Sequence, residues 1–550
     1  MPIVGNTSSQ RKSVPNPPTI GSATAGPAQA SVSFTPSTFN GKLPISFYTA
    51  VSNPGSISAT STSTPVVVSD LTGGTAYTFT VLATNPVGQS SASSSSNSVT
   101  PTIPSFFALG NVDQNLEAWG AYVDSSGNTY AVVGGADSSN TTYNGAFLVK
   151  FSQAGNILWQ KRLYTVNQTF RANGVVFDSL LGSPTVLYSS QGTPFGGIIA
   201  NYTNNGDLQW ARTLTRSGGF YVGGNPYGQP LSSGHNNNAF CGFYDNSSSS
   251  VYAGYLVKYN NNPSREWIKA FRLGTVSAPY NTTILRGTAY DNVSGNGDIF
   301  AVGRTNSATN NYGYRSLTMK VDQSGNQLWA KTLSDSNSSG NQQTELYSCA
   351  LDSSNNVYVC GEYRLPSSGS QGHFIAKYNS SGTLQWQRFV TSSKSINYIW
   401  GATCDSSGNQ YYLMNEGSPN SLVILKVNSS GTLQWQRNIY SGQATPYQSL
   451  PASININSNG RIALTSYFYN NNDQSGPFIA NLNSDGSGTG TYNTSNFTVN
   501  YVSASTISLS TGNLTDASEN NVGPFNPAST DADSTSTNTN GTLTRQVVSF

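Results

Sequence analysis

The chain has 550 residues, enough for roughly three to four ordinary domains or for one large repeat architecture. Lys, Arg, Asp and Glu make up only 9% of it, against about 25% in ordinary soluble domains, and 26 basic and 24 acidic residues leave a net charge of +2. Because neither sign forms a run, the chain lacks the charged surface that nucleic acid or an anionic membrane requires. We expect neither as a partner.

The longest apolar run, Leu422 to Leu425, is far shorter than the roughly 20 residues of a membrane-spanning helix. The amino-terminal residues, from Met1 to Asn6, do not have the pattern of a secretory signal. Four scattered cysteines and two histidines, with no CxxC pair, offer neither a disulfide framework nor a zinc site. We expect no metal and no other cofactor.

After an N-terminal arm at residues 1–13, residues 14–103 carry short alternating apolar runs between Gly, Pro, Asn and Ser. This pattern is typical of a small antiparallel sandwich. The opening Pro17-Pro18-Thr19-Ile20 and the stretch from Leu71 to Asn85 resemble the fibronectin type III family. The resemblance implies that Tyr77 is the tyrosine-corner residue and that Phe34 takes the core place of the family's early tryptophan. Such modules mostly serve as spacers or docking units.

Residues 105–500 repeat one unit seven times. Each unit has a strand that ends in Asp or Asn before a tight polar turn, and later a strand that carries a tryptophan, which the seventh unit lacks. The tryptophans are 49 to 62 residues apart, and four short strands per unit of this length predict an all-β, seven-bladed β-propeller. The two columns are Asp124, Asp178, Asp245, Asp291, Asp352, Asp405 and Asn457, and Trp159, Trp210, Trp267, Trp329, Trp386 and Trp435.

These units resemble the seven-bladed β-propeller repeat abbreviated SBBP, which has an Asp, a Gly-Asn turn, an aromatic residue and a Lys-bearing strand before a Ser-Gly turn. The resemblance implies the fold and says little about function. The run from Gly325 to Trp329 is more weakly similar to quinoprotein dehydrogenase repeats. That family usually has eight blades and a calcium-bound quinone, and the sequence shows neither.

Residues 501–550 contain one strand-like stretch, Thr506 to Ser510, and then a Ser/Thr/Asn-rich tail. We expect an irregular tail whose apolar last residues, Val547 to Phe550, are tied down against the propeller rim or another subunit. Either Phe106 to Leu109 or the C-terminal strand can supply the outer strand of the seventh blade.

The repeated residues favour structural roles over chemistry. The Asp column suits turn formation better than calcium binding, because each loop has one carboxylate, and the Trp column suits packing between blades. Cys241, Cys349 and Cys404 precede the Asp column and are expected to pack as small buried residues. Glu362 and Glu416, which stand at corresponding strand ends of adjacent units, are the best carboxylate pair for glycan cleavage. Since no recognised catalytic signature accompanies them, no enzyme is predicted.

The loops between the second and third strands and between blades are long and differ in every unit, whereas the other turns are short and uniform. In a propeller the long loops share one face, which we call the variable-loop face. Rigid scaffolds present recognition residues on such loops, and Tyr with Ser, Asn and Gly forms adaptable contact surfaces. The candidate binding residues on this face are Tyr227, Arg304, Tyr312, Tyr314, Tyr363, Arg364, Tyr447 and Tyr469.

The low charge, the Ser/Asn/Thr/Gly-rich composition and the sandwich-plus-propeller plan are similar to structural proteins of tailed bacteriophages. We expect a virion fibre, spike or surface decoration protein, made in the host cytoplasm and extracellular after lysis. It is expected to form a homo-oligomer or multicopy assembly, to contact other virion proteins through the sandwich or terminal segments, and to bind host-surface glycan. The alternatives are a bacterial extracellular adhesin and, third, a glycan-cleaving enzyme.

Overall fold

The chain folds as two compact units, Met1–Ser105 and Phe106–Phe550. Our computed structural model describes residues 11–525, in which every regular element is a β-strand. None of the described residues forms a helix capable of crossing a membrane. The description leaves out residues 27–28, 69–70, 72–74, 102–104, 109–115, 136–145, 153–156, 164–169, 179–181, 191–195, 216–219, 223–230, 234–238, 246–252, 260–264, 274–281, 292–295, 307–312, 335–342, 365–370, 418–420, 442–447, 470–474, 488, 494–497, 504–506, 512–514 and 519–521.

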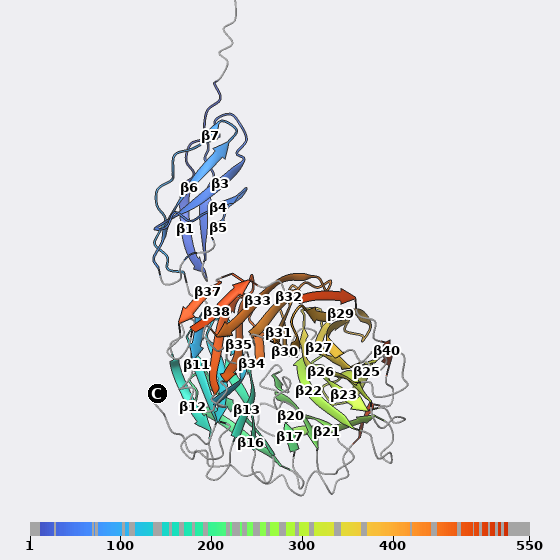
Figure 1. Ribbon diagram of the computed structural model, residues 1–550. Helices are drawn as coiled ribbons and strands as arrows, with labels where there is room; N and C mark the ends of the chain where they lie inside the picture. The colour runs from blue at the N-terminus through green and yellow to red at the C-terminus, as the bar shows by residue number, and fades with distance from the viewer. Residues whose placement is uncertain are drawn as a thin grey trace, which may run out of the picture. The chain divides into compact units, whose positions relative to one another are not determined.

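The N-terminal unit is the predicted fibronectin type III-like sandwich of two sheets, with strand orders β1-β2-β5 and β4-β3-β6-β7 (Figure 1). Alternation along β2 turns Ala30, Val32 and Phe34 into the core. Phe34 is buried with its ring 4.5 Å from that of Tyr48, and Tyr77 is buried in the same core. The strands are β1 (Thr19–Gly26), β2 (Gln29–Thr35), β3 (Phe47–Asn53), β4 (Ser58–Ser61), β5 (Val66–Val68), β6 (Thr78–Asn85) and β7 (Gly88–Gln89).

The second unit is the predicted propeller, and its seven blades follow the seven sequence repeats. Blades 1 to 3 comprise β9 (Leu116–Val123), β10 (Thr129–Gly135), β11 (Ala146–Phe151) and β12 (Ile157–Leu163); β13 (Phe170–Asp178), β14 (Ser183–Ser190), β15 (Gly196–Tyr202) and β16 (Leu208–Thr215); and β17 (Phe220–Val222), β18 (Leu231–Ser233), β19 (Ala239–Asp245), β20 (Gly254–Tyr259) and β21 (Arg265–Leu273). In blade 3 the innermost strand is in two pieces, because β17 and β18 both pair with β19.

Blades 4 to 7 have the same plan of consecutive antiparallel strands. They comprise β22 (Thr283–Tyr290), β23 (Ile299–Asn306), β24 (Tyr314–Val321) and β25 (Gln327–Ser334); β26 (Gln343–Leu351), β27 (Val357–Arg364), β28 (Gln371–Tyr378) and β29 (Leu384–Ser392); β30 (Ile396–Cys404), β31 (Gln410–Glu416), β32 (Ser421–Val427) and β33 (Leu433–Ser441); and β34 (Gln448–Ile456), β35 (Arg461–Tyr469) and β36 (Ser475–Asn483). The outer strand of blade 7 is β8 (Ser105–Ala108), so the N-terminal candidate closes the ring.

The C-terminal residues add outer strands to four blades in reverse order. After β37 (Gly490–Asn493), β38 (Thr498–Ser503) pairs with β33, β39 (Ile507–Thr511) with β29, β40 (Thr515–Ser518) with β25, and β41 (Val522–Phe525) with β21. Figure 1 shows β38 beside β33 and β40 beside β25. The sequence predicted one strand beyond residue 500, and β39 matches it. We call β38 to β41 the C-terminal strands.

The Asp column forms the turns predicted from the sequence. In blade 5, Asp352 Oδ1 accepts hydrogen bonds from the backbone N–H groups of Ser354 (2.9 Å) and Asn356 (3.0 Å). Its Oδ2 accepts from Asn356 Nδ2 and from the Tyr358 hydroxyl, both at 2.8 Å. Burial acts to raise the pKa of Asp352, but these hydrogen bonds hold it below its ordinary value. The Asp352 carboxylate therefore stabilises its own turn.

The Trp column joins neighbouring blades. The indole of Trp329 in blade 4 donates to the Ser380 carbonyl of blade 5 (3.1 Å), and Trp386 donates likewise to Ser429 of blade 6 (3.0 Å). Each ring lies against the glycine of the turn that it contacts. A Cβ added at Gly382, which has a φ of 81°, would lie 2.8 Å from Trp329. The tryptophan that recurs in six of the seven units thus serves packing between blades where the structure describes it.

We expect Gly382→Ala to destabilise the propeller more than Gly182→Ala does. Gly182 also has a positive φ, 64°, but a Cβ there would meet nothing within 4 Å. Gly182→Ala should cost about 1–2 kcal/mol from backbone strain alone, and Gly382→Ala about 1–3 kcal/mol more from the clash with Trp329. Chemical unfolding of both variants measures the difference, and equal costs would contradict the packing role of the tryptophan.

Of the three cysteines expected to be buried, the structure buries Cys349 and leaves Cys404 half-buried, while the side chain of Cys241 lies outside the described residues. Cys360 is fully buried as well. Burial raises the pKa of all three described thiols well above the ordinary value. They are poor nucleophiles for that reason.

Candidate functional site

A pocket of about 460 Å³ opens in blade 5, at the strand ends that carry the variable loops. Its walls are the end of β27, the start of β28, the end of β29 and the linker into blade 6. This is the variable-loop face, since the short Asp352 and Asn379 turns lie at the opposite strand ends. Its polar and charged lining residues are Gln343, Glu362, Arg364, Gln371, His373, Thr391, Ser392, Lys394 and Ser395. We call it the blade 5 pocket.

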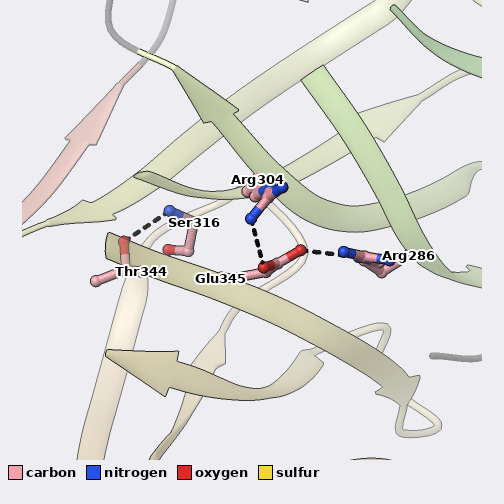
Figure 2. A network of polar contacts seen from close by, with 5 residues as sticks. All are labelled: Arg286, Arg304, Ser316, Thr344 and Glu345. Atoms are coloured by element: carbon pink, nitrogen blue, oxygen red, sulfur yellow. Dashed lines mark hydrogen bonds and ion pairs between the residues drawn. The ribbon is translucent and has the colours of Figure 1, made fainter. Parts of the chain in front are cut away.

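A buried ion-pair network connects blade 4 to blade 5 beside this pocket. Glu345 of β26 accepts from Arg286 Nε at 2.8 Å through Oε1 and from Arg304 Nη1 at 3.0 Å through Oε2. Figure 2 shows the carboxylate of Glu345 between the two guanidinium groups. Nearby, the Ser316 N–H donates to Thr344 Oγ1 (2.8 Å), where Tyr314 and Gln343 form a parallel pair between the two blades.

β-bulges place Arg286 and its counterpart in blade 5, Tyr347. The register between β22 and β23 shifts between Leu285 and Gly287, which leaves Arg286 as the extra residue. In β26 the shift between Leu346 and Ser348 does the same for Tyr347. A bulge re-aims the extra side chain out of the alternating pattern. Arg286 reaches Glu345 of blade 5, and the Tyr347 hydroxyl hydrogen-bonds to Glu362.

Arg304 lies in β23, whereas the sequence placed it on an exposed loop. Its guanidinium is held by Glu345, and its Cζ lies 3.9 Å from the ring centre of Tyr314, the first residue of β24. The side chain is only 21% exposed. The strand extends further than expected because β23 pairs with β24 over its whole length. Arg304 therefore contacts Tyr314 within blade 4, and it links blade 4 to blade 5 through Glu345.

Tyr363 and Arg364 both line the blade 5 pocket, but in different ways. The tyrosine is 9% exposed and its ring lies 4.6 Å from that of Phe389, so it is a buried wall residue and not the exposed loop tyrosine that was predicted. Arg364, which the sequence placed on a loop, is the last residue of β27 and is exposed. Its Nη2 donates to Gln371 Oε1 at 3.2 Å.

The other candidates fall outside the described parts of the chain. Tyr227, Tyr312 and Tyr447 belong to undescribed ranges, and Tyr469 ends β35 with its side chain undescribed. Their roles on the variable-loop face stay predictions.

The two carboxylates of the predicted pair are not in corresponding positions. Tyr358 of β27 and Tyr411 of β31 are equivalent, because each pairs with a lysine of the next strand. Glu362 is four residues after Tyr358, whereas Glu416 is five residues after Tyr411. Because strand side chains alternate, the two project from opposite faces of their sheets. Glu416 thereby turns back to blade 5, where it accepts a hydrogen bond from Ser392 Oγ and lies 3.7 Å from Lys394 Nζ. It is fully buried.

Glu362 is the acid that lines the pocket itself. Burial raises its pKa above the ordinary value, and the charge of Glu345 acts in the same direction. The Tyr347 hydrogen bond and the charges of Arg304 and Arg364 oppose this shift without cancelling it. Glu362 therefore keeps its proton at a higher pH than an exposed glutamate does.

We expect Glu362→Gln to be more stable than the native chain near pH 7. A folded-state pKa above the unfolded one means that the folded chain binds the extra proton, so native stability falls as pH rises through the folded-state pKa. A glutamine at this position does not titrate, so it does not contribute this pH dependence. Unfolding curves between about pH 3 and pH 8 should therefore converge at the acid end and separate toward neutrality. A difference that is constant with pH would contradict this.

A sequence pattern that the predictions do not use marks the bulged residues. Each stands five residues before the Asp or Asn column and precedes a small residue, as Arg286 precedes Gly287 before Asp291. A Cβ at Gly287 would lie 3.0 Å from the Tyr347 carbonyl oxygen, so this small residue permits close approach between blades. The equivalent residues in other blades are Trp119, Asn173, Trp400 and Ala452.

Among the residues that the structure describes, no three His, Cys, Asp or Glu side chains come close enough to hold a metal ion. The arrangement offers instead hydrogen-bond donors and acceptors around a pocket with charges of both signs. Such a lining suits a polar ligand with several hydroxyl groups.

No family model matches the chain, and no curated protein matches it. Several solved structures have a low similarity to the chain. The exotype rhamnogalacturonan lyase YesX is 12% identical, with a TM-score of 0.33 over 86% of this chain and 90% of that one. The NanB sialidase from Streptococcus pneumoniae is 12% identical, with a TM-score of 0.36 over 82% of this chain and 81% of that one. The chicken CNTN1 FN1-FN3 domains are 14% identical, with a TM-score of 0.15 over 56% and 98%. Similarities this low support no conclusion about this chain.

Proposed function

We propose that the protein attaches to host-surface glycan through the blade 5 pocket, without cleaving it, as a structural component of a phage virion. The observation that carries the binding role is the pocket itself, which lies on the face with variable loops and is lined by amide, hydroxyl and guanidinium groups. Gln343, Gln371 and Ser392 can donate to and accept from sugar hydroxyls. The proposal of a virion location rests on the composition and on the sandwich-plus-propeller plan.

Binding without cleavage fits the carboxylate arrangement better than hydrolysis does. A glycan-cleaving pair needs two carboxyl groups that both reach the substrate. Glu362 lines the pocket, but Glu416 is fully buried behind Ser392 and Lys394. The raised pKa of Glu362 is the one observation that favours the enzyme alternative, so the binding test includes an assay for released reducing ends.

The test compares single and multivalent forms of the full chain on immobilised surface polysaccharides. Joining several copies should raise apparent affinity by about 10² to 10⁴ if each copy has one weak site. We expect Arg364→Ala and Gln371→Ala to lower multivalent binding at least about tenfold, because each removes polar contacts from the pocket. Gln385→Ala, at an exposed position beside the short Thr383 turn, is the matched control.

Equal binding by the pocket variants and the control would rule out the blade 5 pocket as the attachment site. Release of reducing ends that Glu362→Gln abolishes would favour the enzyme alternative. Mass spectrometry of purified virions tests the location, since a bacterial adhesin would be present on uninfected cells and absent from virions.

A further inference from the structure

Charged residues are more frequent in the lining of the blade 5 pocket than in the chain as a whole. Only 9% of all residues are charged, yet Glu362, Arg364 and Lys394 line this one pocket. The charge of Arg304 also acts on Glu362, and Glu416 lies 3.7 Å from Lys394. A ligand that consisted of neutral hydroxyl groups alone would not require such a concentration.

Arg364 presents a cation whose hydrogen-bond partner among the described residues is neutral, although its charge also acts on Glu362. It is exposed at the end of β27, and the hydrogen bond that orients it goes to the amide oxygen of Gln371. A guanidinium has five N–H donors in a planar fork that matches a carboxylate. Toward the described residues the guanidinium uses one donor, in the bond to Gln371, so most of its donors remain for a ligand.

Lys394 presents the second cation, on the linker into blade 6. Its side chain is 34% exposed, and its Nζ lies 3.7 Å from Glu416 Oε2, which is longer than a normal hydrogen bond. Glu416 also accepts from Ser392 Oγ and, at 3.5 Å, from Asn438 Nδ2. Lys394 lines the pocket and its ammonium has three donors, so donors that do not face Glu416 can reach a ligand.

We propose that the blade 5 pocket selects an acidic sugar, whose carboxylate contacts Arg364 and Lys394 while its hydroxyl groups contact Gln343 and Gln371. This inference rests on the proposed function and narrows its ligand from any glycan to one with a carboxylate. Glu362 would be the one repulsive group on the lining, and burial keeps it protonated to a higher pH than usual.

The test uses matched pairs of methyl glycosides that differ only in the carboxyl group. The pairs are glucuronide and glucoside, galacturonide and galactoside, and sialoside and its carboxyl-reduced alcohol. Ligand-observed NMR titrations of the full chain measure each member. We expect the acid to bind at least about tenfold more tightly than its neutral partner in one pair or more, because charge-assisted hydrogen bonds are roughly twice as strong as neutral ones. Added salt should reduce that preference.

Arg364→Gln and Lys394→Gln should each weaken binding of the acid much more than binding of its neutral partner, and so remove most of the preference for the acid. Lys42→Gln, at an exposed position of the N-terminal unit, changes the net charge equally and is the control. If neutral members bind as tightly as acids, the acidic-sugar inference fails and the glycan proposal stands. If no member binds and the multivalent chain binds no polysaccharide, both fail.

Discussion

Replacing Glu345 by alanine should destabilise the propeller by about 3–5 kcal/mol, the cost of leaving buried charges without their partner. Arg286 and Arg304, whose side chains are 10% and 21% exposed, would lose the carboxylate that they share. Urea unfolding of the full chain measures the loss. The lower stability should belong to unfolding of the second unit, since all three residues lie in that unit.

The matched control replaces the whole network by apolar residues of similar volume, with Met at 286 and 304 and Leu at 345. Substituting a complete buried network is often neutral or stabilising, because no charge stays buried alone. The triple variant should therefore recover most of the stability that Glu345→Ala loses. Equal losses in the two variants would mean that packing at this position, and not charge compensation, holds blades 4 and 5 together.

A chain that ends at Asn493, and so lacks the C-terminal strands, should lose most of its stability. Val499 and Tyr501 are fully buried in blade 6 and Ile507 is 3% exposed against blade 5. At about 1.5–3 kcal/mol for each buried side chain, these three alone contribute about 5–9 kcal/mol. The truncation also removes the backbone pairing of four outer strands.

A chain that ends at Phe525 keeps all the C-terminal strands and is the control with which the shorter chain is compared. A single substitution tests the same point when the truncated chain does not fold: Tyr501→Ala should cost about 3–5 kcal/mol, and Tyr501→Phe much less. A truncated chain as stable as the control would show that the seven blades hold together without these strands.

The candidate site was only partly predictable. The variable-loop face and Arg364 followed from loop lengths, because long, varied linkers recur between the same strands of every repeat. Arg304 and Tyr363 were assigned to loops, since nothing in the sequence marks where a strand of polar and aromatic residues stops pairing. The pocket depends on how the ends of β27, β28 and β29 meet the linker at Lys394, residues that span 30 positions in the chain.

The sequence by itself determined the all-β class, the sandwich and the number of blades. The Asp or Asn turn, as at Asp352, recurs seven times in the sequence and the column tryptophan six times, so both show the repeat without knowledge of the fold. Only the tertiary structure decided that β8 closes the ring, that the C-terminal strands run back along blades 6 to 3, and that Glu345 lies between Arg286 and Arg304. Those contacts occur once each, between residues distant in the chain, so no local pattern encodes them.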